Sequence, residues 1–188
     1  MENKILYTIT IFSENMVGLL NQITIIFTRR RLNIETLSVS PSAIEGIHKF
    51  TITAFSDPDT IDKVVKQIDK RVGIIKAYYN VDEDLVHQEM ALYKVATDKL
   101  LQLGSTEEFL ARYHAQVLEI TKDYVVLRKT GHYADTQAMF KELSERTGVL
   151  QFIRSGRVAI TKEKVERLSD MLSVMEERAK ENENGANP

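Results

Sequence analysis

The feature that most limits how this chain can fold is a switch in the spacing of its apolar residues near the start. From Lys4 to Ser13 large apolar residues recur at every second position, which predicts a strand. After a short break they recur every three to four positions, as on one face of a helix: Leu19, Leu20, Ile23, Ile26 and Phe27. A strand that leads directly into an amphipathic helix predicts a domain in which helices pack on a sheet.

Further elements follow in the first 81 residues. Strands are predicted at 34–40, 48–55 and 74–81. A second helix is predicted after Asp57-Pro58, because Asp is a favoured N-cap and Pro is favoured at the first helical position. The order βαββαβ is that of a ferredoxin-like unit, an α+β fold with an antiparallel sheet and both helices on one face.

A second series with the same order follows the acidic stretch Asp82-Glu83-Asp84. Ser105 and Glu108 are spaced as a capping box, which predicts the start of its first helix. The remaining predicted elements are strands at 89–96, 117–120 and 124–127, a helix at 134–146, and a strand at 149–160 that is interrupted by Ser155-Gly156. We therefore predict two ferredoxin-like βαββαβ domains, the second of them also an α/β sandwich.

The predicted domain limits follow from these patterns. The first domain is expected at 1–81, a linker at 82–88 and the second domain at 89–162. A C-terminal helical extension is expected at 163–180, and a polar, disordered tail at 181–188.

The first sheet is expected to carry large residues on both faces, with Ile5 and Ile9 on one face and Leu6 and Phe12 on the other. The two helices can cover only one of these faces. A partner chain is the economical cover for the other, so we expect a homodimer, for which edge-strand pairing is a further route.

The composition excludes several kinds of site. The chain has no cysteine, which removes disulfides, thiolate metal ligands and cysteine nucleophiles. Its net charge of -2 gives no general attraction to nucleic acid or to an anionic membrane. The apolar runs are shorter than the roughly 20 residues that cross a bilayer, and the start does not resemble a signal peptide. We expect a cytoplasmic protein.

The sequence offers no catalytic signature. There is no Gly-rich phosphate loop, the four histidines have no metal-ligand spacing, and Ser155-Gly156 lacks the frame of a nucleophile elbow. Arg29-Arg30-Arg31 fits the end of a helix, where the dipole favours cations, better than a nucleic-acid patch. The strand at 48–55 lacks the Gly-rich pattern of an RNA-recognition motif, which weakens that alternative.

The turn before the first helix remains as a candidate binding site. A helix N-terminus presents free N–H groups to a carboxylate, and Gly18 allows a ligand to approach the backbone. Asn15 and Asn33, at the two ends of the helical segment, add neutral donors and acceptors. On local chemistry alone, a turn asparagine and a turn glycine explain these residues at least as well.

The chain resembles the small, regulatory subunit of acetolactate (acetohydroxyacid) synthase, whose N-terminal part is an ACT domain. The resemblance covers about residues 1–162. It is carried by Glu14-Asn15-x-x-Gly18-Leu19-Leu20, Phe27-x-x-Arg30, Leu32-Asn33-Ile34-Glu35-Thr36-Leu37, Val39, Glu89-Met90-Ala91-Leu92-x-Lys94-Val95 and Ile153-Arg154-Ser155-Gly156-Arg157-Val158-Ala159-Ile160. The asparagine motifs occur in many ACT domains, and their combination with Arg-Ser-Gly is specific to this family.

The resemblance implies a regulatory protein without an active site of its own. It would activate a large catalytic subunit that uses thiamine diphosphate, Mg²⁺ and FAD, while this chain would bind no cofactor or metal itself. It would also confer feedback inhibition by valine or another branched-chain amino acid at the interface of two ACT domains. The effector-binding positions carried over from the family are Asn15, Met16, Val17, Gly18, Leu19, Asn33 and Ile34.

Two points stay open at the level of sequence. Arg31 stands where many relatives have a glycine that supplies a left-handed residue at the helix end. The alternative function is a free-standing ACT-type amino-acid sensor that acts on another partner, such as a transcription regulator. The lack of a basic or helix-turn-helix domain speaks against that alternative.

Overall fold

The computed structural model describes residues 4–102, 104–162 and 173, which form two compact units. Among the described residues, unit 1 contains those up to Val86 together with those from Ala159 onward, and unit 2 contains those from His87 to Val158. The domain limits expected from sequence stay a prediction. Apart from Ser173, the helical extension expected at 163–180 and the tail expected at 181–188 lie outside the described residues.

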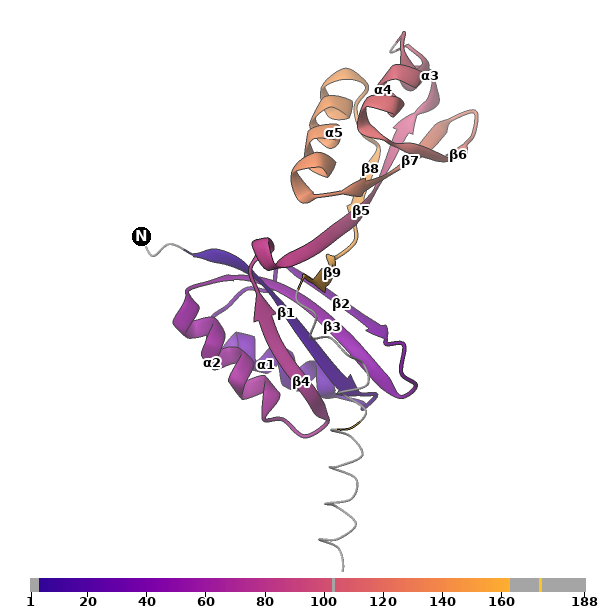
Figure 1. Cartoon of the computed structure of the whole chain (residues 1–188). Coiled ribbons are helices and arrows are strands. Elements are labelled where there is room, and N and C mark those ends of the chain that lie inside the picture. The colour runs from indigo at the N-terminus through magenta and orange to yellow at the C-terminus, as the bar shows by residue number, and fades with distance from the viewer. Residues whose placement is uncertain (1–3, 103, 163–172, 174–188) are drawn as a thin grey trace, which may run out of the picture. The chain divides into compact units, whose positions relative to one another are not determined.

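Unit 1 is a four-stranded antiparallel sheet with the strand order β2-β3-β1-β4. Helices α1 and α2 both lie on one face of this sheet (Figure 1). Its elements are β1 (Ile5–Glu14), α1 (Leu19–Arg29), β2 (Thr36–Pro41), β3 (Ile47–Ser56), α2 (Pro58–Asp69) and β4 (Ile74–Asn80). The predicted βαββαβ order is confirmed, although β2 begins two residues later than expected.

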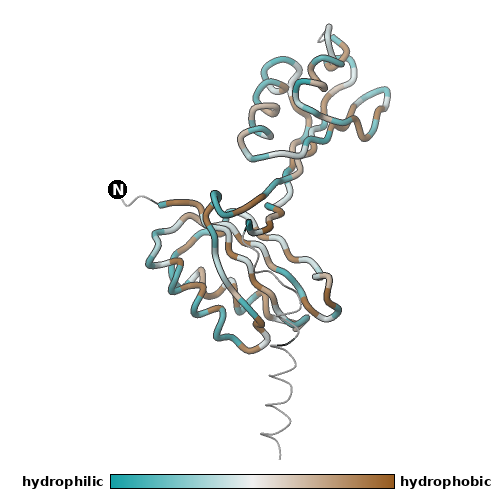
Figure 2. The backbone as a smooth tube through the Cα atoms, viewed as in Figure 1, coloured by the Kyte–Doolittle hydropathy of each residue, from teal (hydrophilic) through white to brown (hydrophobic). Residues whose placement is uncertain are grey.

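The core of unit 1 fills the space between the sheet and its two helices. Cross-strand register places Ile9 opposite Ile52 and Ile11 opposite Phe50 on the helical face. Along α2, hydrophobic and hydrophilic residues alternate with the helical period (Figure 2), so one side packs on the sheet. Asp57 caps this helix as predicted, because its Oδ1 accepts a hydrogen bond from Thr60 N at 2.8 Å.

The opposite face of the first sheet is buried as well, and part of its cover is a strand of the same chain. Lys49 lies on the same face as Phe12, with its Nζ 5.4 Å from the ring centroid. That Nζ also donates a hydrogen bond to the carbonyl of Ala159, in β9 (Val158–Thr161), at 3.3 Å. The sequence analysis had given this role to a partner chain. The strand was missed as a cover because its apolar pattern does not show which sheet it packs on.

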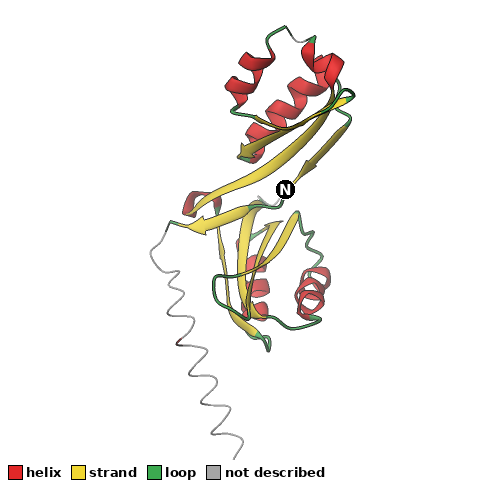
Figure 3. Ribbon diagram, turned by 90° about the vertical axis from the view of Figure 1, so that its right-hand side faces the viewer, coloured by secondary structure: helices red, strands yellow, loops and turns green. Residues whose placement is uncertain are grey.

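Unit 2 repeats the arrangement of unit 1, with the strand order β6-β7-β5-β8. Its helices pack against the core on one face of the sheet, as the red and yellow elements of Figure 3 show. The elements are β5 (Leu85–Ala96), α3 (Thr97–Leu101), α4 (Thr106–Tyr113), β6 (Gln116–Ile120), β7 (Tyr124–Gly131), α5 (Tyr133–Arg146) and β8 (Gln151–Arg154). The second βαββαβ series is thereby confirmed, with its first helix formed in two pieces.

Two strand limits differ from the sequence analysis. Strand β5 begins at Leu85, directly after the short 3-10 helix η1 (Asp82–Asp84), and not at Glu89. The strand expected at 149–160 is divided into β8 and β9, both of which pair with β5. Periodicity did not show these limits, because polar residues inside a paired strand look the same in sequence as a polar connection.

The capping box predicted at Ser105 and Glu108 is wrong. Ser105 precedes α4, but its side chain makes no capping hydrogen bond. A reciprocal capping box instead begins α5, where the backbone N–H of His132 donates to Asp135 Oδ2 at 3.2 Å. The sequence analysis missed it because histidine is not among the favoured N-cap residues.

Candidate functional site

The turn that sequence analysis selected, Asn15–Gly18, connects β1 to α1 and is held by two neighbouring loops. The backbone N–H of Asn15 donates to the carbonyl of Gly46, in the β2–β3 hairpin, at 2.9 Å. The backbone N–H of Glu14 donates to the carbonyl of Gly73, in the α2–β4 connection, also at 2.9 Å. The turn is therefore fixed to the sheet from both sides.

Gly18 sets the direction in which the chain enters α1. It is the N-cap of the helix and has a φ of 85°, in the left-handed region that favours glycine. A Cβ at this position would meet no atom within 4 Å. The need for glycine here is thus conformational, and the space beside the backbone is open to a ligand.

The start of α1 presents free hydrogen-bond donors. No side chain caps the helix, and no acidic residue stands in its first turn. Within the part of the chain that the structure describes, no acceptor meets the backbone N–H groups of Val17, Gly18, Leu20 and Asn21. Together with the helix dipole, these donors suit a carboxylate.

The side chains of the turn divide into exposed and buried ones. Asn15 and Gly18 are exposed, Met16 is 43% exposed, and Val17 is fully exposed at 105%. Leu19 is only 2% exposed and belongs to the core, so a ligand could reach its backbone alone. An exposed valine beside an uncapped helix end leaves an apolar surface next to the free donors.

Gly73 supports the turn and was missed by the sequence analysis. The Sδ of Met16 lies 2.6 Å from the position that a Cβ at residue 73 would occupy, and Gly73 has a φ of +81°. The side chain of Met16 therefore packs directly on this backbone. The one signal in the sequence was a glycine before the last strand of unit 1, which reads as an ordinary turn residue.

The other end of α1 carries Asn33 and Ile34. The helix ends in a Schellman motif, in which the N–H of Leu32 donates to the carbonyl of Phe27 and that of Arg31 to Thr28, each at 3.0 Å. Arg31 takes the left-handed position with a φ of 55°. Asn33 is then exposed, whereas Ile34 is partly buried against the core of unit 1.

The two predicted asparagines do not meet within one chain. Asn15 precedes α1 and Asn33 follows it, and the helix between them has 11 residues. At a rise of about 1.5 Å per residue the helix alone separates the two ends by roughly 16 Å. In a single chain Asn15 and Asn33 therefore lie at opposite ends of α1.

Models of known protein families match residues in both units. The model of the acetohydroxyacid synthase (AHAS) small subunit-like ACT domain matches residues 9–76, which contain the turn and Asn33. The model of the small subunit of acetolactate synthase matches residues 88–163. The chain belongs to the acetolactate synthase small-subunit family. The resemblance seen in the sequence is thereby confirmed.

Curated relatives of this family match over nearly their whole length. The acetolactate synthase small subunit of Mycobacterium bovis is 26% identical over 159 residues, which cover 83% of this chain and 92% of the relative. That of Haemophilus influenzae is 25% identical over 158 residues, covering 82% and 94%. That of Bacillus subtilis is 26% identical over 155 residues, covering 82% and 89%.

A solved structure shows the same fold. The small subunit of acetolactate synthase from Thermotoga maritima superposes with a TM-score of 0.75, covering 85% of this chain and 99% of that one, at 24% identity. The two-unit ferredoxin-like architecture is thus shared with that protein.

The family motif in unit 2 forms an ion pair whose carboxylate is buried. Glu89, only 8% exposed, accepts hydrogen bonds from Arg154 Nη1 at both carboxylate oxygens, at 3.0 and 2.8 Å. Ser155 exchanges hydrogen bonds with the backbone of Met90, at 2.9 Å through its hydroxyl and at 2.8 Å through its N–H. The two motif segments are therefore neighbouring strands, β5 and β8, that these residues hold together.

Metal ligands and membrane spans were also sought among the described residues. In those ranges no group of three or more His, Cys, Asp or Glu side chains is placed to hold a metal ion. Likewise, no described helix is long and apolar enough to span a bilayer.

Proposed function

We propose that the chain is a regulatory subunit that binds a branched-chain amino acid at the Asn15–Gly18 turn and passes the signal to a catalytic acetolactate synthase subunit. The observation that carries the proposal is the uncapped start of α1, with free N–H groups beside an exposed apolar valine, in a member of this family. The free donors suit the effector's carboxylate, Asn15 its ammonium group, and Val17 its aliphatic side chain.

The site is completed by a second copy of the chain. One chain holds Asn15 and Asn33 at opposite ends of α1, so the asparagine that faces Asn15 across a bound ligand comes from the partner. The surface that would meet the partner is exposed and apolar: Leu20 on α1 and Val39 on the edge strand β2 are each 41% exposed. Burial of these side chains in a dimer would stabilise it by the hydrophobic effect.

Regulation would follow from a shift between dimer arrangements. The effector can shift the equilibrium only by the difference between its binding free energies for the two arrangements. Such coupling free energies are typically about 1–3 kcal/mol. The favoured arrangement would then hold the catalytic subunit in a less active state, while the unliganded regulatory subunit raises its activity.

Catalysis itself would belong to the partner. That large subunit would hold the thiamine diphosphate, Mg²⁺ and FAD, and the complex would work in the cytoplasm. In this proposal the described residues of the present chain supply binding and regulation only.

The decisive experiment is reconstitution with the cognate large subunit. We expect addition of this chain to raise acetolactate formation, and titration with valine, leucine and isoleucine to reverse that gain for at least one of them. Their side chains differ by a single methylene or its placement, worth about 1–3 kcal/mol in a pocket, so the preferred effector must be measured.

The Asn15→Ala variant tests the site. It removes a ligand contact and leaves the core intact, so we expect loss of feedback inhibition with activation retained. Gln102→Ala, at an exposed position after α3 in unit 2, is the matched control and should keep both. Full inhibition in the Asn15→Ala complex would show that the site has been placed wrongly.

A further inference from the structure

The two ends of α1 carry opposite charges. Residues 29–36, at the end of the helix, contain three arginines and one glutamate. At its start, the turn contains Glu14, and the β2–β3 hairpin contains Glu45. The N–H of Asn15 bonds to the carbonyl of Gly46, so the two glutamates belong to neighbouring loops. One end of α1 is therefore basic and the other is acidic.

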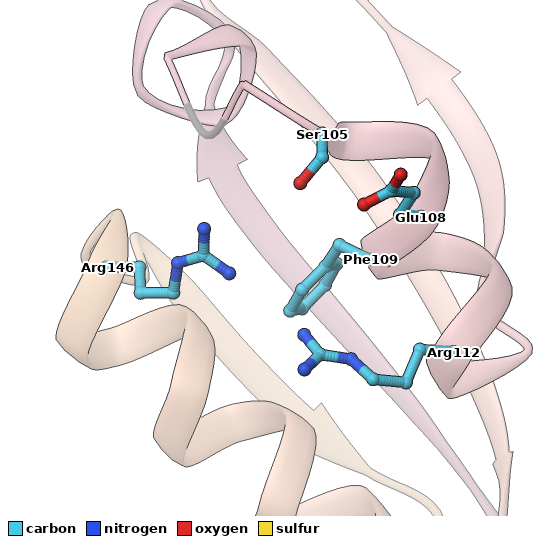
Figure 4. A pocket seen from close by; sticks show the side chains of 5 residues that line it. All are labelled: Ser105, Glu108, Phe109, Arg112 and Arg146. Atoms are coloured by element: carbon cyan, nitrogen blue, oxygen red, sulfur yellow. The ribbon is translucent and has the colours of Figure 1, made fainter.

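Unit 2 shows how such charges are matched when their partners lie in the same chain. In Figure 4, Arg112 on α4 and Arg146 on α5 extend toward the same hollow. Both guanidinium groups donate hydrogen bonds to one oxygen of Glu142, at 2.6 and 2.9 Å. These arginines are therefore paired within the chain.

The charges at the ends of α1 are not matched in this way. Arg31, Glu14 and Glu45 are all exposed, and in the described parts of the chain no group forms a hydrogen bond or an ion pair with any of these three side chains. Arg30 differs, because its Nη2 donates to Gln67 Oε1 in α2 at 3.3 Å. The three exposed charges can therefore meet another molecule without the loss of a contact of the fold.

The edge of the first sheet shows how a second copy of the chain would bring these ends together. Strand β2 pairs with β3 on one side, and its other edge carries no described strand. Two copies of an edge strand related by a two-fold axis pair antiparallel, because only then do both strands make the same hydrogen bonds. The start of β2 in one chain then lies beside the end of β2 in the other.

This pairing places the basic end of one chain against the acidic end of its partner. When it is centred on β2, it sets Thr36 opposite Pro41 of the partner subunit. Continued outward by the same number of residues along both chains, it sets residues 31 and 32 beside residues 45 and 46 of the partner. Arg31 then lies next to Glu45 of the partner subunit, and the two-fold axis repeats this contact.

We propose that Arg31 of each chain forms an ion pair with Glu45 of the partner subunit, and that these two pairs fix the register in which two copies dock. Opposite charges at two symmetric contacts favour this register, whereas a shifted register leaves the charges unpaired. The inference rests on the dimer of the proposed function and deepens it. In this register Asn33 also comes to lie at the partner's hairpin, which holds the partner's Asn15–Gly18 turn.

Charge reversal in the full chain tests the pair. Arg31→Glu and Glu45→Arg each replace two attractions by two repulsions in the symmetric dimer. A single exposed ion pair contributes little to affinity, but here the sign of the interaction changes at two contacts. We expect each variant to raise the dimer dissociation constant on the order of tenfold, as measured by sedimentation velocity without effector.

Recombining the charges gives a second readout. A dimer of one Arg31→Glu chain and one Glu45→Arg chain has opposite charges at both contacts. In an equimolar mixture, mixed dimers should therefore exceed the half that random pairing gives, as counted by native mass spectrometry. The double variant, with Arg31→Glu and Glu45→Arg in one chain, should dimerise as tightly as the wild type.

Two controls separate this pair from general effects of charge. Lys63→Glu reverses an exposed charge on α2, which packs on β4 at the opposite edge of the sheet, and should leave the dissociation constant unchanged. At about 1 M salt the Debye length falls to about 3 Å, so the difference between Arg31→Glu and the wild type should shrink. Circular dichroism of each variant checks that the chain is folded.

Three results would overturn the inference alone. They are an unchanged dissociation constant in either single variant, random pairing in the mixture, and a double variant that dimerises no more tightly than the single variants. In each case the wild-type dimer remains, so the proposed function stands. A wild-type chain that stays monomeric would instead overturn the proposed dimer together with this inference.

Discussion

Arg31 adopts a backbone conformation that glycine adopts more easily. Its φ of 55° lies in the left-handed region, where an L side chain brings Cβ close to the following carbonyl. The Schellman motif around it requires this conformation, which is most often supplied by glycine. The sequence analysis marked Arg31 as a departure from the resemblance, and the structure shows that the arginine takes the left-handed conformation nonetheless.

We predict that Arg31→Gly stabilises the protein. Removal of Cβ relieves the strain, and this gain is partly offset by the greater freedom of glycine in the unfolded chain. The net expectation is an increase of about 0.5–1 kcal/mol in the free energy of unfolding, measured by urea denaturation.

Lys70 provides the matched control for Arg31. It is the C-cap residue of α2 and has a φ of -84°, which any residue adopts. Lys70→Gly should therefore give no gain. A loss of stability in Arg31→Gly would mean that the arginine side chain contributes more than its backbone strain costs.

Gly73 is a second position at which the structure favours one amino acid. Its backbone conformation and the neighbouring Met16 both favour glycine there. We predict that Gly73→Ala destabilises the protein by about 1–2 kcal/mol through its positive φ, and further through contact with Met16. Gly46 has a similar φ of +79°, but a Cβ added there would meet no atom within 4 Å. Gly46→Ala should therefore cost only the backbone strain.

A double-mutant cycle separates these two contributions. Gly73→Ala should cost less in a Met16→Ala background, whereas Gly46→Ala should cost the same in both backgrounds. Equal costs for Gly73→Ala with and without Met16 would show that the methionine moves aside freely and does not brace the turn.

At the scale of elements, the carboxylate of Glu142 in α5 joins this helix to α4 by accepting hydrogen bonds from Arg112 and Tyr113. The hydroxyl of Tyr113, followed by the guanidinium groups of Arg146 and Arg112, lowers the pKa of Glu142. A folded pKa below the unfolded one means that this group stabilises the fold above the unfolded pKa, near 4.3. That contribution is lost as the pH falls through the folded pKa.

We predict that Tyr113→Phe lowers the free energy of unfolding by about 1 kcal/mol at neutral pH, by removing one hydrogen bond to a charged group. The difference from the parent chain should shrink as the pH falls through the lowered pKa of Glu142 in the folded state. Urea denaturation at several pH values measures this. A difference that grows as the pH is lowered would show that Glu142 is not the group involved.

At the scale of the whole molecule, the function proposed for unit 1 requires two chains. If each effector is held by Asn15 of one chain and Asn33 of the other, then a dimer made only of the Asn15→Ala variant should not bind valine. The same should hold for a dimer made only of the Asn33→Ala variant. A mixed dimer of the two variants would have one site with both asparagines intact.

We predict that mixing the two variants in equal amounts restores binding to about a quarter of the wild-type number of sites, because half of the dimers are mixed and each has one intact site. Calorimetry with valine, after the subunits have exchanged, counts the sites. Mixing Asn15→Ala with itself is the control. If the mixture binds no more than either variant, the asparagines do not act from different chains.

Much of the fold could be predicted from the sequence because it rests on local periodicity. The change from a period of two to a period of three or four residues marks each strand and helix, and their order then allows few topologies. The Asp57-Pro58 cap was predictable for the same reason, since all of its partners lie within one turn of helix. The turn at Asn15–Gly18 could be placed because it lies between two such elements.

The remaining features depended on contacts between residues far apart in the chain. The cover of the first sheet by β9, the packing of Met16 on Gly73, and the Glu89–Arg154 pair each join segments that no local pattern relates. Ser105 and Glu108 show the reverse, because their spacing predicts a capping box that does not form in the folded chain. The sequence by itself determined the elements and their order, through side-chain periodicity. Only the tertiary structure decided which residues of distant elements contact one another, since those contacts depend on packing and not on neighbours in the chain.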